Sequence, residues 1–313
     1  MIPQCHNLVV AAFLCAAATL ALLLTPMRAS AQELEPRAYS NAPLGLNFLV
    51  TGFSYIEGGI ATDPAGPIEN AELAVWGPVL GYARTLDVAG RSAKFDVVVP
   101  YGFLSGTADV AGQPRDREVS GFWDPKLRFS MNFFGAPALT AQEFARYRQD
   151  WIVGMSVQVG VPLGQYDDER VVNLGSHRWS IKPELGVSKA LGAWTLEFAA
   201  GTTFYTDNDD YFGDQTREQE PVYSVQGHLV YTFASRIWFG VDGTYYEGGV
   251  TTTDGVESSD RLSSSRLGLT LSLPVNAQSS IKLFVHSGVS VRTGSDFDAI
   301  GATWQYRWGG GPK

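Results

Sequence analysis

The side chains best suited to covalent chemistry in this sequence are its histidines, and their spacing argues against catalysis. His177, His228 and His286 are the histidines that follow the N-terminal 31 residues. A Ser–His pair needs hydrogen-bond reach and a third group that orients the imidazole. His286 and Ser287 are adjacent on an alternating segment, so they point to opposite faces. No two histidines stand at metal-ligand spacing on one short segment. We therefore expect no enzyme.

An acidic segment is the other place where ligand-type residues gather. Residues 206–214 read TDNDDYFGD, and Asp207, Asp209 and Asp210 could supply oxygen ligands to Ca²⁺ or Mg²⁺. The sixth-position glycine and the later glutamate of a calcium loop are absent. A solvated loop is the better interpretation, so the three aspartates are weak candidates and we predict neither a metal nor a cofactor.

Charged residues also alternate with apolar ones, most clearly after residue 177. One set of side chains is Trp179, Ile181, Pro183, Leu185 and Val187; the interleaved set is Arg178, Ser180, Lys182, Glu184, Gly186 and Ser188. This period of two predicts a strand with one apolar and one polar face. A strand of an outer-membrane barrel needs this arrangement, because lipid lies outside and water or a polar plug inside.

If the apolar faces look outward, a set of polar side chains lines the lumen and is the candidate substrate path. Its members are Arg178, Lys182, Glu184, Glu197, His228, Asp242, Arg266, Lys282, His286 and Arg292. They could form a selectivity lining or a salt-bridge network that closes the lumen, and both interpretations stay open. Lys182 and Glu184 share a face and could pair with each other. Arg178, next to a polar loop, is the strongest candidate for a constriction or a substrate contact.

Composition supports export and a β-rich fold. The chain has 23 Lys and Arg against 32 Asp and Glu, a net charge of -9, which argues against a nucleic-acid partner. Both cysteines, Cys5 and Cys15, lie within residues 1–31, so the rest of the chain has no thiol and no disulfide. The sequence also holds 34 glycines and 12% aromatic residues, a bias that favours a barrel over a disulfide-rich secreted domain.

Residues 1–31 are predicted to be a cleaved signal peptide. Residues 8–24 are almost wholly apolar, and Ala29-Ser30-Ala31 is a small-residue cleavage site. The segment before the apolar run has no Lys or Arg, so an N-terminal membrane anchor is the alternative. No later segment has the ~18 consecutive apolar residues of a spanning helix.

Twelve segments are strand candidates, and most are long enough to cross a bilayer at a tilt. They are residues 46–57, 71–86, 93–104, 120–134, 151–163, 177–190, 193–206, 221–234, 236–247, 261–273, 279–292 and 297–308. The first two alternate poorly, and their faces are not assigned. We predict an all-β fold, a transmembrane antiparallel up-and-down β-barrel of about 12 strands over residues 46–308. Residues 32–45 form a periplasmic lead-in and residues 309–313 a tail. A soluble β-sandwich, the alternative, would have shorter strands.

The connections between these segments differ in length on the two sides. The odd-numbered ones are long and polar: residues 58–70, 106–119, 165–176, 207–220 and 248–260. Most even-numbered ones are tight, such as residues 191–192 and 234–235. Long loops on one side and short turns on the other are typical of outer-membrane barrels, with both termini periplasmic. The even connection 135–150 is an exception, and the spacing of Phe144 and Tyr147 predicts a short helix under the barrel.

Several motifs resemble a known family, the outer-membrane transporters named for the MetA pathway of phenol degradation. The chain has a P-x-G-x-Y loop at residues 162–166, N-x-G-x-x-R-W at 173–179 and K-P-E-x-G-x-S-K at 182–189. GFWDPKLRFSMNFFGAPAL at 121–139, FYTDNDDYFG at 204–213 and IGATWQYRWG at 300–309 add to the resemblance. It covers most of the chain after the signal peptide, and Leu163 departs from it where Thr is usual.

The resemblance implies a channel or transporter for small apolar or aromatic compounds, loosely similar to the long-chain fatty-acid barrel transporters. The implied location is the outer membrane of a Gram-negative bacterium, where lipid and lipopolysaccharide surround the barrel. Two alternatives stay open: a structural or adhesion-type barrel without transport, and, less favoured, a barrel enzyme acting on lipids. The oligomeric state is not predicted.

Overall fold

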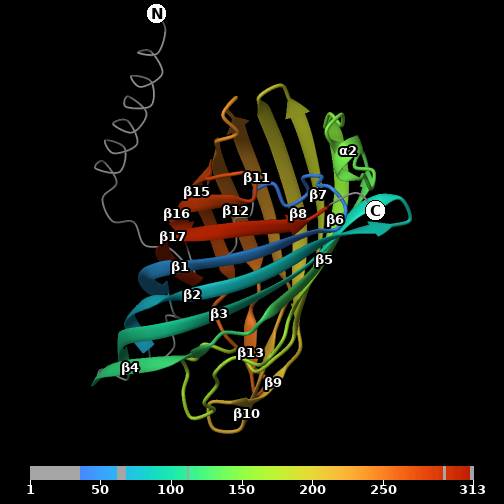
Figure 1. The fold of residues 1–313 in the computed structure, drawn as a ribbon. Helices are drawn as coiled ribbons and strands as arrows, with labels where there is room; N and C mark the ends of the chain where they lie inside the picture. The colour runs from blue at the N-terminus through green and yellow to red at the C-terminus, as the bar shows by residue number, and fades with distance from the viewer. Residues whose placement is uncertain (1–35, 62–67, 111–112, 292–293, 311–313) are drawn as a thin grey trace, which may run out of the picture.

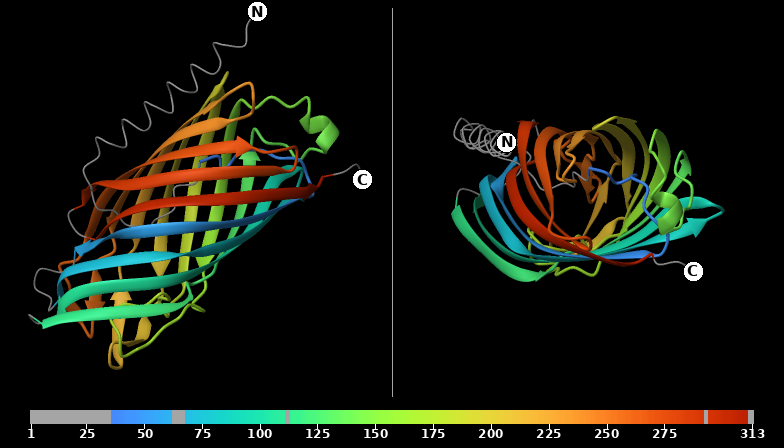
Figure 2. Two further views of the ribbon diagram at one scale, coloured as in Figure 1. Left: turned by 60° about the vertical axis from the view of Figure 1, so that its left-hand side comes forward. Right: turned by 45° about the horizontal axis from the view of Figure 1, so that its top comes forward.

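The wall of the molecule is one antiparallel sheet that closes on itself (Figures 1 and 2). The computed structural model describes residues 36–61, 68–110, 113–291 and 294–310; the predicted signal peptide and Arg292 lie outside them. The sheet has 13 strands, two of which are halves of one interrupted strand, so the wall has the predicted twelve. The wall strands are β1 (Leu46–Ala61), β2 (Ile68–Val88), β3 (Arg91–Val110), β4 (Gln113–Phe122), β5 (Lys126–Phe134), β6 (Trp151–Gly160), β7 (Ser180–Leu191), β8 (Trp194–Tyr205), β11 (Val222–Thr232), β12 (Trp238–Gly248), β15 (Leu262–Pro274), β16 (Ser279–Val291) and β17 (Gly294–Gly309).

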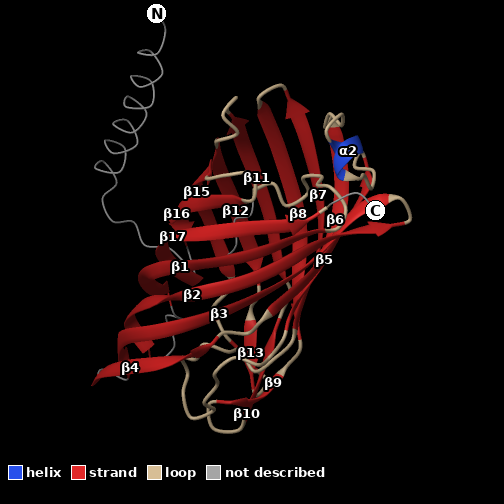
Figure 3. Ribbon diagram, viewed as in Figure 1, coloured by secondary structure: helices blue, strands red, loops and turns tan. Residues whose placement is uncertain are grey.

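Each strand pairs with its neighbours in sequence, and β1 closes the ring by pairing with both β2 and β17. Closure leaves no sheet edge at the seam between the first and last strands, where unpaired backbone groups would otherwise face lipid. The fold is therefore the predicted all-β up-and-down barrel, and most of the described backbone is strand (Figure 3).

The alternation in β7 divides its side chains as predicted. Ile181 and Leu185 are 46% and 60% exposed on the outer surface, whereas Glu184 and Ser188 are buried inside. The same division recurs in β11, β12, β15 and β16, where apolar residues point outward and polar ones inward. An apolar exterior around a polar interior suits a barrel in lipid.

Strands β1 to β4 have apolar residues on both faces, which explains why the first two alternate poorly in the sequence. Phe53 and Leu80 are exposed on the outside, whereas Val75 and Leu104 are buried inside. A strand that is apolar on both faces carries no period-two signal. The interior of the barrel is therefore apolar on this side and polar on the other.

Two predicted loops are wrong, because the hairpins continue through them. Strands β1 and β2 stay paired as far as Ile60 and Ala71, and β3 and β4 as far as Val110 and Gln113. Polar residues in these stretches suggested loops, but antiparallel pairing satisfies the backbone there equally well. Residues 207–220 and 248–260, also predicted as loops, contain β9 (Asn208–Tyr211), β10 (Gln215–Gln219), β13 (Thr251–Thr253) and β14 (Val256–Glu257). These four form a small separate sheet.

The predicted strand 120–134 is interrupted at residues 123–125. Strand β4 ends at Phe122 and β5 begins at Lys126, and both pair with β3. Pro125 has no N–H for the ladder, so a break is favoured at this point. Strand β6 pairs with β5 but not with β4, and the chain leaves the wall after Gly160 as the inner loop, residues 161–179.

The long even connection contains the predicted short helix, α2 (Ala141–Phe144), at the same end of the barrel as the C-terminal end of β17 (Figure 1). Thr140 and Glu143 cap it reciprocally, and the Phe144 and Tyr147 rings stack at 5.7 Å. Among the described residues, no helix has the length and apolar character to span a bilayer.

Candidate functional site in the barrel lumen

The N-terminal segment, residues 36–45, folds into the end of the barrel where β1 begins and crosses its opening (Figure 2). Its anchor is Tyr39, which is 5% exposed. Gly154 of β6 and Gly186 of β7 are register partners, and the Tyr39 ring lies against both. A Cβ atom at Gly186 would be 2.0 Å from Tyr39 Cε2. The absence of side chains at both positions therefore creates the seat for this ring.

Polar contacts fix the same segment to the wall. Tyr39 Oη donates to Glu184 Oε1 at 3.0 Å, and Asn132 Nδ2 donates to the Tyr39 carbonyl at 3.0 Å. The Arg37 N–H donates to Glu197 Oε2 at 2.5 Å, and the Arg37 guanidinium lies 5.8 Å from the Trp238 ring. The segment is held by residues of β5, β7, β8 and β12, so it joins opposite sides of the barrel.

Nine of the ten predicted lumen residues are described, and they do point inward. Glu184, Glu197, His228, Asp242 and Arg266 are buried, and Lys182, Lys282 and His286 alternate with outward apolar neighbours. Arg178 was expected on a strand, but it lies at the end of the inner loop, just before β7 begins. The tenth, Arg292, lies outside the described residues.

Most of these charges are compensated within the wall. Lys182 Nζ lies 2.9 Å from Glu184 Oε2, which confirms the expected pair, and Gln226 Nε2 donates to the same oxygen at 3.0 Å. Arg128 Nε lies 3.2 Å from Asp96 Oδ2. These contacts fit the salt-bridge interpretation of the lumen better than a row of free charges.

A second compensated group crosses strands β8, β11 and β12. Glu197, His228 and Asp242 are direct register partners. His228 Nδ1 lies 2.7 Å from Asp242 Oδ1, and Thr270 Oγ1 donates to Asp242 Oδ2 at 2.8 Å. Asp242 is 0% exposed, so both carboxylate oxygens are satisfied inside the wall.

The space left between the N-terminal segment and these charges is small. A void of about 20 Å³ is lined by Ala38, Arg128, Ser156, Gln158, Lys182, Glu184 and Gln226. A cavity needs roughly 10–15 Å³ to hold one water molecule. This void itself therefore has room for little more than one water molecule.

On the opposite side, the inner loop packs against an apolar wall, defined here as Ile56, Leu73, Val75, Leu104, Val119 and Trp123. Leu174 of the loop is buried with Val75 and Leu104, and Val172 packs beside it. These contacts place an apolar surface inside the barrel, between β1–β4 and the loop. Because the first two strands alternate poorly, their faces were not assigned, and this surface was not predicted.

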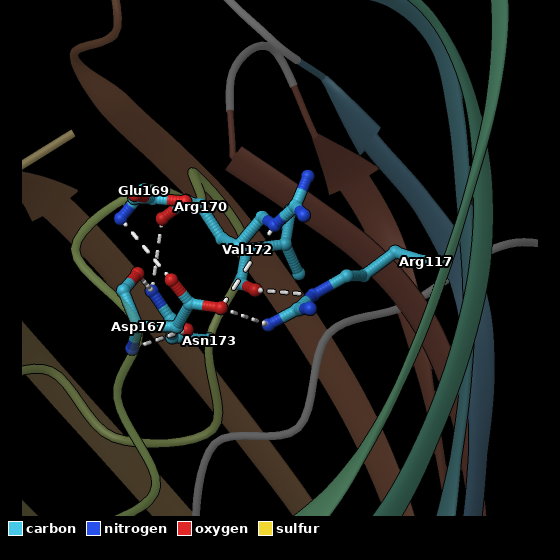
Figure 4. Close-up of polar contacts among 6 residues, drawn as sticks. All are labelled: Arg117, Asp167, Glu169, Arg170, Val172 and Asn173. Atoms are coloured by element: carbon cyan, nitrogen blue, oxygen red, sulfur yellow. Dashed lines mark hydrogen bonds and ion pairs between the residues drawn. The ribbon is translucent and has the colours of Figure 1, made fainter. Parts of the chain in front are cut away.

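Arg117 of β4 fixes the loop to this wall (Figure 4). Its Nε donates to the Val172 carbonyl at 3.2 Å, and its Nη2 lies 3.9 Å from Asp167 Oδ2. Within the loop, Asn173 Nδ2 donates to the carbonyls of Asp167 and Arg170, each at 2.9 Å (Figure 4). The loop is therefore bound to the apolar wall on one side, and contacts such as Tyr166 Oη to the Asp210 carbonyl at 2.9 Å bind it to the small sheet.

Asp124, in the break between β4 and β5, closes the base of the inner loop. Its Oδ1 accepts from the Gly164 N–H at 2.9 Å, and its Oδ2 accepts from the Ser176 N–H at 2.8 Å and from Ser176 Oγ at 2.6 Å. The interruption of the strand thus frees a carboxylate to clamp both ends of the loop.

Arg178, at the end of the loop, differs from the other lumen cations. Its guanidinium stacks on Tyr205 at 4.5 Å and donates to the Gln219 side-chain oxygen. Its Nη1 is buried without a hydrogen-bond partner, and no carboxylate lies within ion-pair distance among the described residues. Burial lowers the pKa of Arg178, and the cation of Arg217 adds to that effect.

The predicted acidic segment contributes to the small sheet. Asp210 Oδ2 lies 3.1 Å from His177 Nε2, whereas Asp207 and Asp209 are exposed. In the described part of the chain, no three His, Cys, Asp or Glu side chains gather as metal ligands would.

Tyr39, Arg117, Asp124 and Arg217 were missed by sequence reasoning. Two signals were present: Trp-Asp-Pro inside a predicted strand marks a break, and two inward glycines on adjacent strands mark a close approach. Nothing in the sequence indicated which residue would fill that space.

Comparisons with known proteins agree with this architecture. The family model described as "Putative MetA-pathway of phenol degradation" matches residues 66–306. An outer membrane channel from Pseudomonas putida F1 is 20% identical with a TM-score of 0.75, over 88% of this chain and 100% of that chain. The transport unit of the autotransporter AIDA-I from Escherichia coli is 8% identical with a TM-score of 0.50, over 93% of this chain and 96% of that chain.

No curated protein matches the chain. At such low identity the two structural likenesses show the fold alone, an outer-membrane type of barrel, whereas the family match rests on the sequence itself. It spans most of the barrel, from the start of β2 nearly to the end of β17. The chain therefore belongs to the MetA-pathway of phenol degradation family.

Proposed function

We propose that this protein is a gated outer-membrane channel for small apolar or aromatic compounds in a Gram-negative bacterium. The observation that carries the proposal is the apolar wall inside the barrel. A channel for ions or sugars has no use for buried Val75, Leu104 and Leu174 on one side of its lumen. An apolar solute gains free energy by leaving water for such a surface, about 25 cal/mol per Å² of apolar area.

The N-terminal segment makes this channel a closed one at rest. Since only about 20 Å³ remains beside Ala38, a solute of aromatic size passes after Tyr39 leaves its seat. The family match supports a role in handling aromatic compounds. The process needs no covalent chemistry, so the charged lumen residues hold the segment and the wall rather than react.

The surroundings of the barrel follow from the same assignment. The outward apolar residues face membrane lipid, and the small sheet of β9, β10, β13 and β14 lies on the side of lipopolysaccharide. Aromatic residues near the ends of the strands, such as Trp194 with Tyr231 at 4.8 Å, occupy the interface.

Uptake by whole cells tests the proposal, because the outer membrane is then the barrier. We expect a deletion strain to take up a dilute phenolic compound more slowly than its parent. If the deletion strain takes it up as fast as the parent does, the proposal is wrong.

A matched pair of variants tests the apolar wall itself. Val75→Thr combined with Val119→Thr keeps the shape of the wall but adds hydroxyls, so it should slow uptake. Val285→Thr makes the same change on the lipid side and should leave uptake unchanged. If both variants take up the compound at the same rate, the apolar wall is not part of the route of the solute.

A further inference from the structure

Two arginines at the extracellular end of the lumen have hydrogen-bonding capacity that the protein does not use. Arg178 Nη1 and Arg217 Nε are buried atoms without hydrogen-bond partners among the described residues. Each guanidinium is held flat against a tyrosine, Arg178 on Tyr205 at 4.5 Å and Arg217 on Tyr211 at 4.7 Å. These four residues, with Gln219, are called the arginine site.

The charges at the arginine site are only partly compensated. Arg217 Nη2 lies 3.7 Å from Asp260 Oδ2, and that carboxylate also accepts from the Thr251 N–H at 2.9 Å and from its hydroxyl at 2.6 Å. Arg178 has a neutral amide, Gln219, as its hydrogen-bond partner. A cation taken out of water without a counter-ion is costly, so this position favours an anion when one is present.

Acidic residues lie both on the small sheet, among them Asp209, Asp210 and Glu218, and in a second group away from the arginine site. A cavity of about 900 Å³ at the extracellular ends of β1–β4 and β17 is lined by Glu57, Glu72, Asp116, Glu118 and Asp298. These acidic residues alternate along their strands with Leu73 and Arg117, which line the same cavity. The cationic character of the arginine site is therefore local: it belongs to Arg178, which has no ion-pair partner among the described residues, whereas Arg217 pairs with Asp260.

The arginine site and the apolar wall meet at one loop. Leu174 packs on the apolar wall, and Arg178, four residues later, stacks on Tyr205 of the opposite, polar side. A ligand between them would meet an apolar surface at one end and a guanidinium at the other. Guanidinium binds carboxylates through paired N–H donors, which gives geometric selectivity.

We propose that the solute is an apolar or aromatic carboxylate, whose carboxylate binds Arg178 with help from Arg217. That the solute passes through the lumen rests on the proposed function, whereas the binding site does not. A carboxylate solute differs from a neutral phenol, which has no carboxylate for the guanidinium to bind. Arg178 would then act as the residue that determines specificity at the mouth.

Binding to the full-length folded protein in lipid nanodiscs tests the assignment. The probes are 4-fluorobenzoate and its neutral counterpart 4-fluorobenzyl alcohol. Fluorine NMR measures the binding of each probe, and empty nanodiscs give the background from the lipid. We expect 4-fluorobenzoate to bind more tightly than the alcohol, and Arg178→Gln to weaken its binding at least tenfold. Arg178→Lys should retain part of it, because the charge stays and the paired donors are lost.

Arg148→Gln is the matched control, since Arg148 is exposed in the connection that contains α2, at the other end of the barrel from the arginine site. The proposal is overturned if Arg178→Gln binds 4-fluorobenzoate as the unaltered protein does, or if the alcohol binds equally well. Displacement of 4-fluorobenzoate by equimolar inorganic phosphate would also overturn it, by showing a site for any anion. Carboxylate binding that depends on Arg178, together with unchanged uptake in the deletion strain, would refute the proposed function alone.

Discussion

Tyr39 Oη donates to Glu184 Oε1 at 3.0 Å, across 145 residues of sequence. The contact joins the N-terminal segment to β7, and Glu184 also binds Lys182 and Gln226. A single carboxylate thus holds both the segment that crosses the opening of the barrel and the charges that line the lumen. The position of this segment depends on a few contacts that can be changed one at a time.

Removing the Tyr39 ring should open the lumen to ions. In Tyr39→Ala the seat formed by Gly154 and Gly186 is empty, so we expect a severalfold rise in conductance in planar lipid bilayers. Gly186→Val should do the same from the other side, because its side chain would occupy the position of the ring. Tyr223→Ala, on the lipid face, should leave conductance at the level of the unaltered protein.

Adjacent residues of β11 test which face is lipid. Val225 is 40% exposed and points outward, whereas Gln226 points inward and donates to Glu184 at 3.0 Å. Val225→Arg should impair assembly, with a cost of about 2–4 kcal/mol near the midplane. Gln226→Arg can keep a donor on the same carboxylate and should assemble normally. Assembly is measured by the heat-modifiable shift on gels, and equal defects in both variants would contradict the assignment of the faces.

Most of the barrel could be predicted because its polar side carries a strict period of two. The wall strands β7, β8, β11, β12, β15, β16 and β17 begin and end within a few residues of their predicted bounds, and Lys182 and Glu184 form the expected pair. The paired extensions of β1–β4 were missed because polar residues outside the membrane resemble loops, whichever way their backbone is bonded.

The site was harder to predict, because it depends on contacts between distant segments. Arg117 and Val172 are 55 residues apart, and Tyr39 meets Gly186 only after the barrel has closed. Neither contact leaves a local pattern in the sequence. The inner apolar wall was not predicted for a different reason. Strands β1 and β2 are apolar on both faces, so they lack the alternation from which the inward face of a strand is predicted.

The buried pair of His228 and Asp242 should be needed for stability. Asp242 is 0% exposed and lies 2.7 Å from His228 Nδ1. His228→Ala leaves a buried carboxylate without its partner, at a cost of about 3–5 kcal/mol. The double variant His228→Ala with Asp242→Asn removes that charge and should recover part of the loss. Unfolding by urea in liposomes measures both, and additive losses would show that the two residues are not coupled.

Asp124 should control the order of the inner loop. Asp124→Asn replaces one acceptor oxygen by a donor, so it loses contacts to Gly164 or to the N–H and hydroxyl of Ser176. A hydrogen bond to a charged group contributes about 1.5–3 kcal/mol. We expect trypsin to cleave the folded variant after Arg170, a half-exposed residue of this loop, faster than it cleaves the unaltered protein. Asp207→Asn, in an exposed position of another loop, is the control. Equal cleavage of all three proteins would contradict this role of Asp124 and would assign the order of the loop to other contacts, such as those of Arg117 and Tyr166.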